Sequence, residues 1–256
     1  MTQDRKRNDI LDISRRILDA FLKIQRPCKA SEICTLVDLP HSSIYNTLKK
    51  MSTVGLLDKL DGSRYFLSAK FLVYGDLYTQ HQNKLPHISD LVDALAMVTG
   101  CTSQLCTLAK YKYMVIHECV PDVDYAVRSE VMGQNIPVTW TASGRLLLSN
   151  IPLKEIRENL EEFELKGPDS RAIDFEKFRA EMDQFCDQGY FQTPSMMSSD
   201  YMCFATPIYD ENFNCIYTFC VTAHNKILAD PSNRVLETLQ AYRAKAQDVF
   251  CPPRTF

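Results

Sequence analysis

The amino-acid sequence predicts an α+β fold in two domains, a small helical N-terminal domain and a larger domain built on an antiparallel sheet. Three observations support this prediction. Apolar residues recur at helical spacing through the first part of the chain, two strand-like runs flank Asp61-Gly62, and the remainder mixes amphipathic helices with alternating strands. We place the domains at residues 1–69 and 85–256, with a linker helix at 70–84 between them.

The composition is that of a globular protein with an uneven distribution of charge. The 256 residues are 45% hydrophobic and 24% charged, which allows two packed cores. There is no run as apolar as a membrane span and no signal peptide, so we expect a cytoplasmic protein. The ten cysteines are scattered and predict free thiols. Residues 1–70 hold 13 Lys and Arg against 8 Asp and Glu, which suggests a polyanionic partner.

Three helices are expected in the N-terminal domain. The first spans residues 10–24, and the second is short and opens at Ser31-Glu32. The third runs from about residue 43 to 54, with Ser42 as its N-cap after Pro40 and with Gly55 ending it. The apolar residues at helical spacing in the first helix are Ile10, Ile13, Ile17, Phe21 and Ile24. In the other two helices, the side chains expected to face the core are Ile33, Leu36, Val37, Ile44, Leu48 and Met51.

A hairpin is expected directly after these helices. The strand-like runs 56–60 and 63–67 flank Asp61-Gly62, which is a strong turn signal. Three helices followed by a hairpin form the winged helix-turn-helix layout. Its third helix leaves Tyr45, Asn46, Lys49 and Lys50 off the apolar stripe.

The rest of the chain predicts a second domain of helices on an antiparallel sheet. A connecting helix and a second helix, interrupted near Pro86, fill residues 70–98, with Gly100 after them. Cys220 and Thr222 have the same parity on a strand, so both should face one side. The expected strands are 104–109, 113–120, 125–131, 201–209 and 214–223, and the expected helices are 141–149, 153–163, 175–188 and 232–250.

Several motifs, in order along the chain, resemble the IclR (isocitrate-lyase-regulator) family. They are Ala30-Ser31-Glu32-Ile33, the segment from Leu39 to Tyr45, Gly55-Leu56-Leu57, the wing 61–67, residues 133–138 with Thr141-Ala142-Ser143-Gly144-Arg145, Gly189-Tyr190, and the segment from Cys203 to Asp210. The resemblance implies a winged helix-turn-helix joined to a GAF-like effector-binding domain. It implies a homodimeric or homotetrameric transcriptional regulator, without enzymatic activity or cofactor. Such a regulator binds a palindromic double-stranded operator, here of a catabolic operon, under the control of a small carboxylate.

The DNA contacts implied by the resemblance lie on the helix-turn-helix and the wing. In this motif the second helix enters the major groove, where Asn pairs with adenine and cations meet phosphates. Asn46 stands where many family members have Arg, so the base preference is expected to differ. The predicted DNA-binding residues are Ser31, His41, Ser42, Ser43, Tyr45, Asn46, Lys49, Lys50 and Arg64.

The effector site is expected where the segment from Thr141 opens a helix. Backbone N–H groups in a first helical turn lack internal partners and suit a carboxylate. The alternative for the cysteines is that they are small buried hydrophobic residues. Carrying the family's pocket over residue by residue gives the effector-binding set Ala142, Ser143, Gly144, Thr193, Cys203, Cys220 and Thr222.

Three other interpretations compete with this one. The winged helix could serve a protein-interaction scaffold instead of DNA. A nucleophile among Cys119, Cys186, Cys203 and Cys220, with His117 or His224 as base, lacks any known surrounding signature. A zinc site at His117 and Cys119, with Cys101 or Cys106, lacks a supporting ligand pair. We therefore predict neither catalysis nor a metal.

Overall fold

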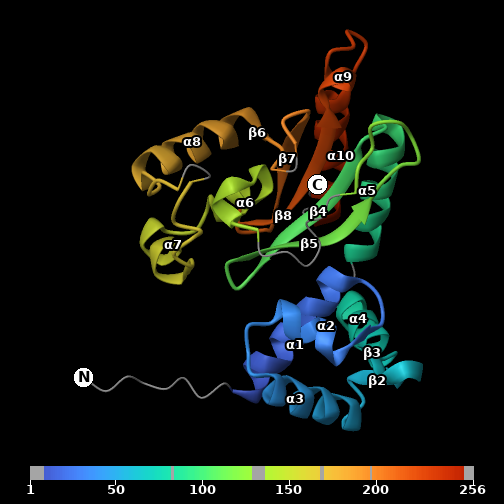
Figure 1. Ribbon diagram of the computed structural model, residues 1–256. Helices are drawn as coiled ribbons and strands as arrows, with labels where there is room; N and C mark the ends of the chain where they lie inside the picture. The colour runs from blue at the N-terminus through green and yellow to red at the C-terminus, as the bar shows by residue number, and fades with distance from the viewer. Residues whose placement is uncertain (1–8, 82–83, 129–135, 168–169, 197, 251–256) are drawn as a thin grey trace. The chain divides into compact units, whose positions relative to one another are not determined.

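The structure, a computed structural model, describes residues 9–81, 84–128, 136–167, 170–196 and 198–250 (Figure 1). The chain divides into two compact units. The described residues up to His81 form most of the first unit, and those from Lys84 onward form the second. The predicted α+β fold with an antiparallel sheet is confirmed, and the helix expected as a linker belongs to the first unit.

The first unit combines four helices with a small sheet among its described residues. The sheet has the strand order β1-β3-β2, and the short strand β1 was not predicted because two residues carry no periodic signal. The helices are α1 (Ile10–Ile24), α2 (Ala30–Leu36), α3 (His41–Thr53) and α4 (Lys70–His81). The strands are β1 (Cys28–Lys29), β2 (Leu57–Leu60) and β3 (Arg64–Leu67), with the 3-10 turn η1 (Asp61–Ser63) in the hairpin.

Helix α3 begins earlier than predicted. The carbonyl oxygen of Pro40 accepts hydrogen bonds from the N–H groups of Ser43 and Ile44, at 2.9 and 3.2 Å. Pro40 is therefore the N-cap, and the prediction that Ser42 caps the helix is wrong. The predicted end at Gly55 is confirmed, since this residue adopts a left-handed φ of 75°. The N–H of Leu56 then donates to Met51, 2.8 Å away, as in a Schellman motif.

One apolar cluster joins α1, α2 and α3 with the small sheet. The apolar stripe of α1 and the predicted core residues of α3 are buried except at the two ends of α1, where Ile10 is 42% exposed and Ile24 is partly buried. Phe21 meets Phe66 edge to face at 5.9 Å between ring centroids. The prediction that Leu36 faces inward is wrong, because its side chain is 51% exposed. Helix α2 ends at this residue, and Val37 enters the core from extended backbone.

The second unit contains a five-stranded antiparallel sheet with the order β5-β4-β8-β7-β6. Helices α5 and α10 pack on one face, and α6 packs on the other, as Figure 1 shows. The strands are β4 (Thr102–Ala109), β5 (Lys112–Cys119), β6 (Phe191–Pro194), β7 (Tyr201–Tyr209) and β8 (Cys215–His224). The helices are α5 (Leu85–Thr99), η2 (Val138–Trp140), α6 (Ala142–Leu148), α7 (Leu153–Asn159), α8 (Phe175–Gln188), α9 (Asn225–Leu228) and α10 (Val235–Phe250).

Two predicted elements differ from the structure. The strand expected at 125–131 is wrong for its described part, because Tyr125 has a φ of 67° within a turn and 126–128 form no ladder. Residues 129–131 lie outside the described residues. The helix expected at 153–163 ends at Asn159, where Leu160 becomes extended. Strand β6 was missed because it holds four residues and ends in Pro194.

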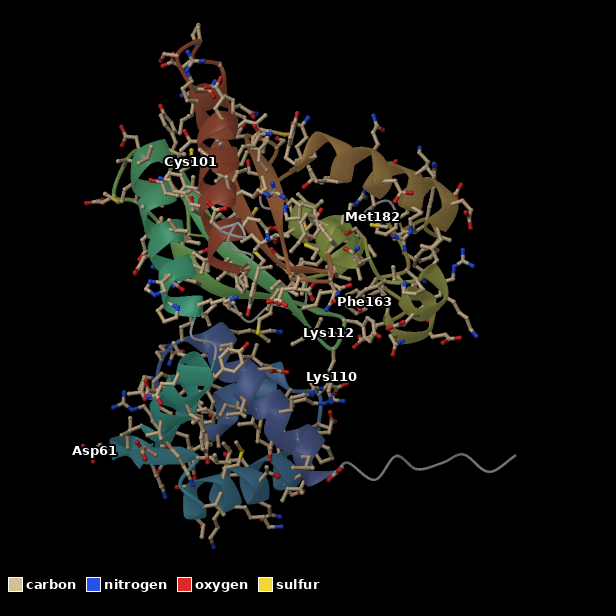
Figure 2. The ribbon with its side chains drawn as sticks, turned by 180° about the vertical axis from the view of Figure 1, so that it is seen from behind. Asp61, Cys101, Lys110, Lys112, Phe163 and Met182 are labelled. Atoms are coloured by element: carbon tan, nitrogen blue, oxygen red, sulfur yellow. The ribbon has the colours of Figure 1, made fainter. Side chains whose placement is uncertain are left out.

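A buried carboxylate fixes the segment that leads into α6. Glu164 is fully buried and accepts a hydrogen bond from Lys112, at 3.1 Å; Figure 2 labels this lysine beside Phe163. The backbone carbonyl of Glu164 accepts from the hydroxyl of Thr139, at 2.7 Å, and the Trp140 indole donates to a neighbouring carbonyl. These bonds anchor η2 and thereby the start of α6.

Candidate nucleic-acid interface and ligand site

Helix α3 carries an exposed polar face opposite its core residues. Ser42, Tyr45, Asn46 and Lys49 are all exposed and follow the spacing i, i+3, i+4, i+7, so they share one side of the helix. His41 and Lys50 border them and are also exposed. We call these six residues the α3 face. Of the other predicted DNA contacts, Ser31 is exposed on α2 and Ser43 is half-buried.

The lysines of the α3 face differ from the arginines of α1. Arg15 binds Asp12 and Asp19, at 3.0 and 2.7 Å, and Arg16 binds Asp12 at 2.9 Å. Lys49 and Lys50 have no acidic partner among the described residues. Unpaired exposed cations on a helix face offer charge to an anionic partner, whereas paired ones are already neutralised.

The predicted wing residue Arg64 stands at the start of β3, beside the hairpin tip. Figure 2 labels Asp61 at this tip, and the backbone carbonyl of Asp61 accepts a hydrogen bond from Arg64 Nε, at 3.2 Å. Gly62 has a φ of 70°, which the tight turn requires. The other guanidinium N–H groups of this exposed arginine have no acidic partner within the described ranges.

The predicted effector residues of the sheet form neighbouring rows. Thr193, Cys203 and Thr222 are register partners across β6, β7 and β8. Cys220 lies in the next row, between Ala205 and Gln104. The alternation of side chains along a strand predicted only that Cys220 and Thr222 face the same side. The register between the strands adds Thr193 and Cys203 to that side.

Helix α6 covers this face and supplies the other predicted residues. Ala142 and Ser143 are 1% exposed, and α6 packs on β4, β7 and β8. The Ser143 hydroxyl lies near the Cys106 and Cys220 thiols, but its Oγ has no hydrogen-bond partner among the described residues. We call the set Ala142, Ser143, Thr193, Cys203, Cys220 and Thr222 the α6 site.

Gly144 has a structural role of its own. A Cβ atom at this position would lie 2.0 Å from the carbonyl oxygen of Val138, so only glycine fits. Its N–H donates to Thr141 Oγ1, at 2.8 Å, and is not free to bind a ligand. The geometry therefore explains Gly144 by packing, contrary to the expectation that its N–H meets a carboxylate.

The thiols of the α6 site are not equivalent. Interaction with the neighbouring Cys220 thiol lowers the pKa of Cys203, whereas interaction with Cys203 together with burial raises the pKa of Cys220. Burial raises the pKa of the Cys106 thiol to about 11, and this thiol accepts a hydrogen bond from Tyr113 at 3.0 Å. Cys203 is half-buried, whereas Cys106 and Cys220 are buried.

Several polar residues of this face were not predicted. Gln104 is 4% exposed and donates to Glu118, at 2.7 Å, in the row of Cys220. Thr218 lies beside Cys106, and its buried hydroxyl has no hydrogen-bond partner among the described residues. The sequence signal was available: Gln104 and Cys106 alternate on a strand of otherwise apolar and small residues. The register that joins them to Cys220 was not.

The catalytic and metal interpretations find no geometric support within the described residues. His117 binds Asp93, at 2.7 Å, and is paired with Leu105 in the sheet, so Cys106 faces the other side. No described group of three or more His, Cys, Asp or Glu is arranged to hold a metal ion. Cys186 has no described side chain. All cysteines with described side chains are free.

Comparison with known proteins gives one consistent result. A family model described as the C-terminal part of the bacterial transcriptional regulator IclR matches residues 77–249, more than half of the chain. The HTH-type transcriptional regulator KdgR of Escherichia coli (strain K12) is 24% identical over 188 residues, 73% of this chain and 71% of that protein. The Pca regulon regulatory protein of Pseudomonas putida is 26% identical over 217 residues, 81% of this chain and 72% of that protein.

Solved structures share the fold over nearly the whole chain. An IclR homologue from Microbacterium hydrocarbonoxydans, crystallised with 4-hydroxybenzoate, has a TM-score of 0.72 at 19% identity. The match covers 94% of this chain and 99% of that chain. At this identity the likeness concerns the fold and leaves the ligand open. No helix among the described residues is long and apolar enough to cross a membrane.

Proposed function

Because the chain belongs to the IclR family of bacterial transcriptional regulators, which are not enzymes, we propose that it binds operator DNA through its α3 face and that a small organic acid at the α6 site controls this binding. A regulator of chromosomal DNA works in the cytoplasm. We propose that the genes it controls belong to a catabolic operon; among the relatives, the Pca regulon regulatory protein is named for a regulon. The single observation that carries the DNA proposal is the exposed, unpaired polar face of α3.

The mode of DNA binding follows from the residue types on this face. Asn46 offers the donor and acceptor pair that matches adenine in the major groove. Lys49 and Lys50 bind phosphates, and Arg64 contacts the backbone or minor groove from the wing. The backbone N–H groups of His41 and Ser42 precede the first helical bonds of α3, which suits a phosphate. Ser31 and Ser43 complete the proposed contacts.

The effector proposal rests on one buried hydroxyl without a partner among the described residues, that of Ser143. An unsatisfied buried hydroxyl costs about 1–3 kcal/mol, which a ligand oxygen can relieve. Ser143 offers such a group in the α6 site, and Thr193 and Thr222 offer further hydroxyls on the same face. The homologue crystallised with 4-hydroxybenzoate makes an aromatic acid the first candidate. For the acid to control DNA binding, it must bind the DNA-bound and the DNA-free state of the protein with different affinities.

The test begins with genome-wide mapping of the sites that the protein occupies. A mapped fragment is then used in gel shifts at increasing salt, with and without members of a panel of aromatic and sugar acids. We expect binding that falls steeply with salt and changes with one acid. Binding to no DNA fragment at low salt contradicts the regulator and favours the protein-interaction scaffold, which nothing on the α3 face otherwise supports.

We further propose that a second copy of the chain covers helix α4. Leu72, Val73 and Leu77 are 77%, 65% and 65% exposed. This is more apolar side-chain surface than a surface helix of a monomeric protein usually exposes to water. Paired helix-turn-helix units read palindromic half-sites, which requires a dimer or a tetramer built as a dimer of dimers.

Light scattering of the full chain tests this interface. The double change Leu72→Glu and Leu77→Glu is expected to lower the molar mass to that of a monomer. Leu11→Glu is the control, since Leu11 is 73% exposed on α1 and should leave the mass unchanged. A parent protein that is monomeric at all concentrations, with and without DNA, contradicts the proposal.

A further inference from the structure

The residues of the α6 site carry hydroxyl, thiol and methyl groups but no positive charge. An ionised carboxylate that leaves water needs a cation or several hydrogen-bond donors, because removing an unpaired charge from water is very unfavourable. The backbone N–H of Gly144 does not meet this need, since it already donates to Thr141. An acid bound at the α6 site therefore requires a cation from a neighbouring position.

Arg145 follows the site directly in α6 but is already bound by protein groups. Its guanidinium lies 5.3 Å from the ring centroids of both Phe178 and Phe191. Its Nη1 pairs with Glu181 at 2.9 Å, and its Nε donates to the carbonyl oxygen of Thr139 at 2.8 Å. These contacts hold α6 against its neighbours and explain Arg145 by packing.

Arg128 lies at the edge of the sheet face that carries the α6 site. Thr102 is the register partner of Thr222, and its hydroxyl donates to the carbonyl oxygen of Val127, at 2.6 Å. Glu118 belongs to the next row of this face, and its Oε1 lies 3.8 Å from Nη1 of Arg128. Two contacts on neighbouring rows thus fix the backbone and the side chain of this segment beside the site.

The two members of this ion pair differ in exposure. The side chain of Glu118 is 2% exposed and accepts a hydrogen bond from Gln104, at 2.7 Å, whereas the side chain of Arg128 is 70% exposed. A separation of 3.8 Å is longer than a charge-assisted hydrogen bond, so charge attraction alone holds this pair. The planar guanidinium has five N–H donors and can form a bidentate pair with another carboxylate.

We propose that Arg128 binds the acid group of a carboxylate ligand at the α6 site, and that it leaves Glu118 to do so. This proposal rests on the proposed function, because it names the residue that recognises the acid. Ser143, a buried hydroxyl without a partner within the described ranges, hydrogen-bonds the same ligand from α6. The ligand class is an aromatic or sugar acid that is ionised at pH 7, as opposed to a neutral analogue.

Glu118 and the ligand compete for one guanidinium. The negative charge of Glu118 keeps Arg128 beside the site in the free protein, but it also repels a second carboxylate there. A bidentate pair with the ligand gains short hydrogen bonds that the 3.8 Å pair lacks, so the exchange is favourable. Removing the charge of Arg128 should therefore weaken acid binding, whereas removing the charge of Glu118 should strengthen it.

Calorimetric titration of the full-length protein at pH 7 tests this exchange. The probes are 4-hydroxybenzoate, benzoate and gluconate, each compared with its neutral primary amide. We expect the parent to bind at least one acid about tenfold more tightly than the matching amide. Arg128→Gln should lose about tenfold or more in affinity for that acid and keep its affinity for the amide. Arg128→Lys retains the charge without the planar fork and should recover part of the loss.

Glu118→Gln is the second variant, because it retains the shape and an acceptor for Gln104. It should bind the acid about two- to fivefold more tightly than the parent, with an unchanged affinity for the amide. Arg234→Gln is the matched control. Arg234 is 68% exposed and is paired with Glu237 at 3.2 Å, but it precedes α10, which packs on the opposite face of the sheet. Its loss should leave both affinities unchanged.

The outcomes separate this proposal from the proposed function. An acid affinity that Arg128→Gln leaves unchanged, or lowers equally for acid and amide, overturns the proposal while the acid effector stands. Acid binding by Glu118→Gln that is no tighter than that of the parent overturns it as well. A parent protein that binds none of the acids contradicts the acid effector of the proposed function, and the role of Arg128 with it.

Discussion

The α3 face and the α6 site both present polar side chains, but they differ in what those side chains lack. Lys49 and Lys50 have no acidic partner among the described residues, yet they are exposed and water solvates them. The hydroxyl of Ser143 has neither a described protein partner nor contact with bulk water. An exposed cation without a partner costs little free energy, because water solvates it, whereas a buried unsatisfied hydroxyl costs about 1–3 kcal/mol.

This difference suits the two proposed ligands. A polyanion is met by exposed charges, and affinity comes from the counterions that it releases. A small molecule is held by few groups, and each group contributes more because water is excluded. Salt should therefore weaken binding at the α3 face strongly and binding at the α6 site little. The following predictions test this contrast, from the largest expected effect to the smallest.

The low accessibility of the α6 site to water depends on the tight packing of α6, and Gly144→Ala tests this packing. The added Cβ would lie 2.0 Å from the Val138 carbonyl oxygen, so we expect a loss of about 2–3 kcal/mol of stability. Lys154→Ala is the control in the same unit, because its side chain is 87% exposed on α7; it should change the stability by less than about 0.5 kcal/mol. Circular dichroism follows both variants, and the fluorescence of Trp140, the single tryptophan, follows the second unit. An undiminished stability of Gly144→Ala would show that α6 is not held so closely.

Asn46→Ala tests whether the α3 face reads bases. Loss of a bidentate contact should cost about 1–3 kcal/mol at one base pair and relax specificity there. Gel shifts with single-base variants of a mapped operator measure the effect. Arg15→Ala is the control, because Arg15 is already paired with Asp12 and Asp19. If Asn46→Ala retains the parent's preference at every position, Asn46 makes no base contact.

Lys50→Ala sharpens the contrast in salt dependence. Removing one phosphate contact should weaken binding to all sequences several-fold and reduce the salt slope by about 1. A salt titration of fluorescence anisotropy gives both quantities. An unchanged slope places Lys50 outside the DNA contact.

Thr222→Val is the mildest test and concerns the α6 site. Losing one neutral hydrogen bond should cost about 0.5–1.5 kcal/mol, a two- to twelvefold weaker affinity for the effector, with little dependence on salt. Calorimetric titration with the acid found in the panel measures it. Thr206→Val is the control: its hydroxyl is also buried, but Thr206 is paired with Phe219 on the other face of the sheet. Equal losses in both variants would argue against a direct contact by Thr222.

The residues that periodicity alone revealed are those whose environment is set by neighbours in sequence. The core of α3, its exposed polar side and its end at Gly55 follow from helical spacing and one left-handed residue. Predictions from the local sequence failed where the surrounding structure determined the role of a residue. Pro40 took the capping role expected of Ser42, and Leu36 turned outward because α2 ended at that position. The short strand β1 exists because β3 pairs with it.

The α6 site illustrates the same division. Sequence parity put Cys220 and Thr222 on one face, and the family resemblance pointed to Ser143 and Cys203. Only the register of β4, β7 and β8 decided that Gln104 and Cys106 share this face, and only the packing of α6 left Ser143 without a partner. The physical reason is range: helical spacing and turn chemistry act over a few residues, whereas register and burial depend on contacts between segments about twenty to more than a hundred residues apart.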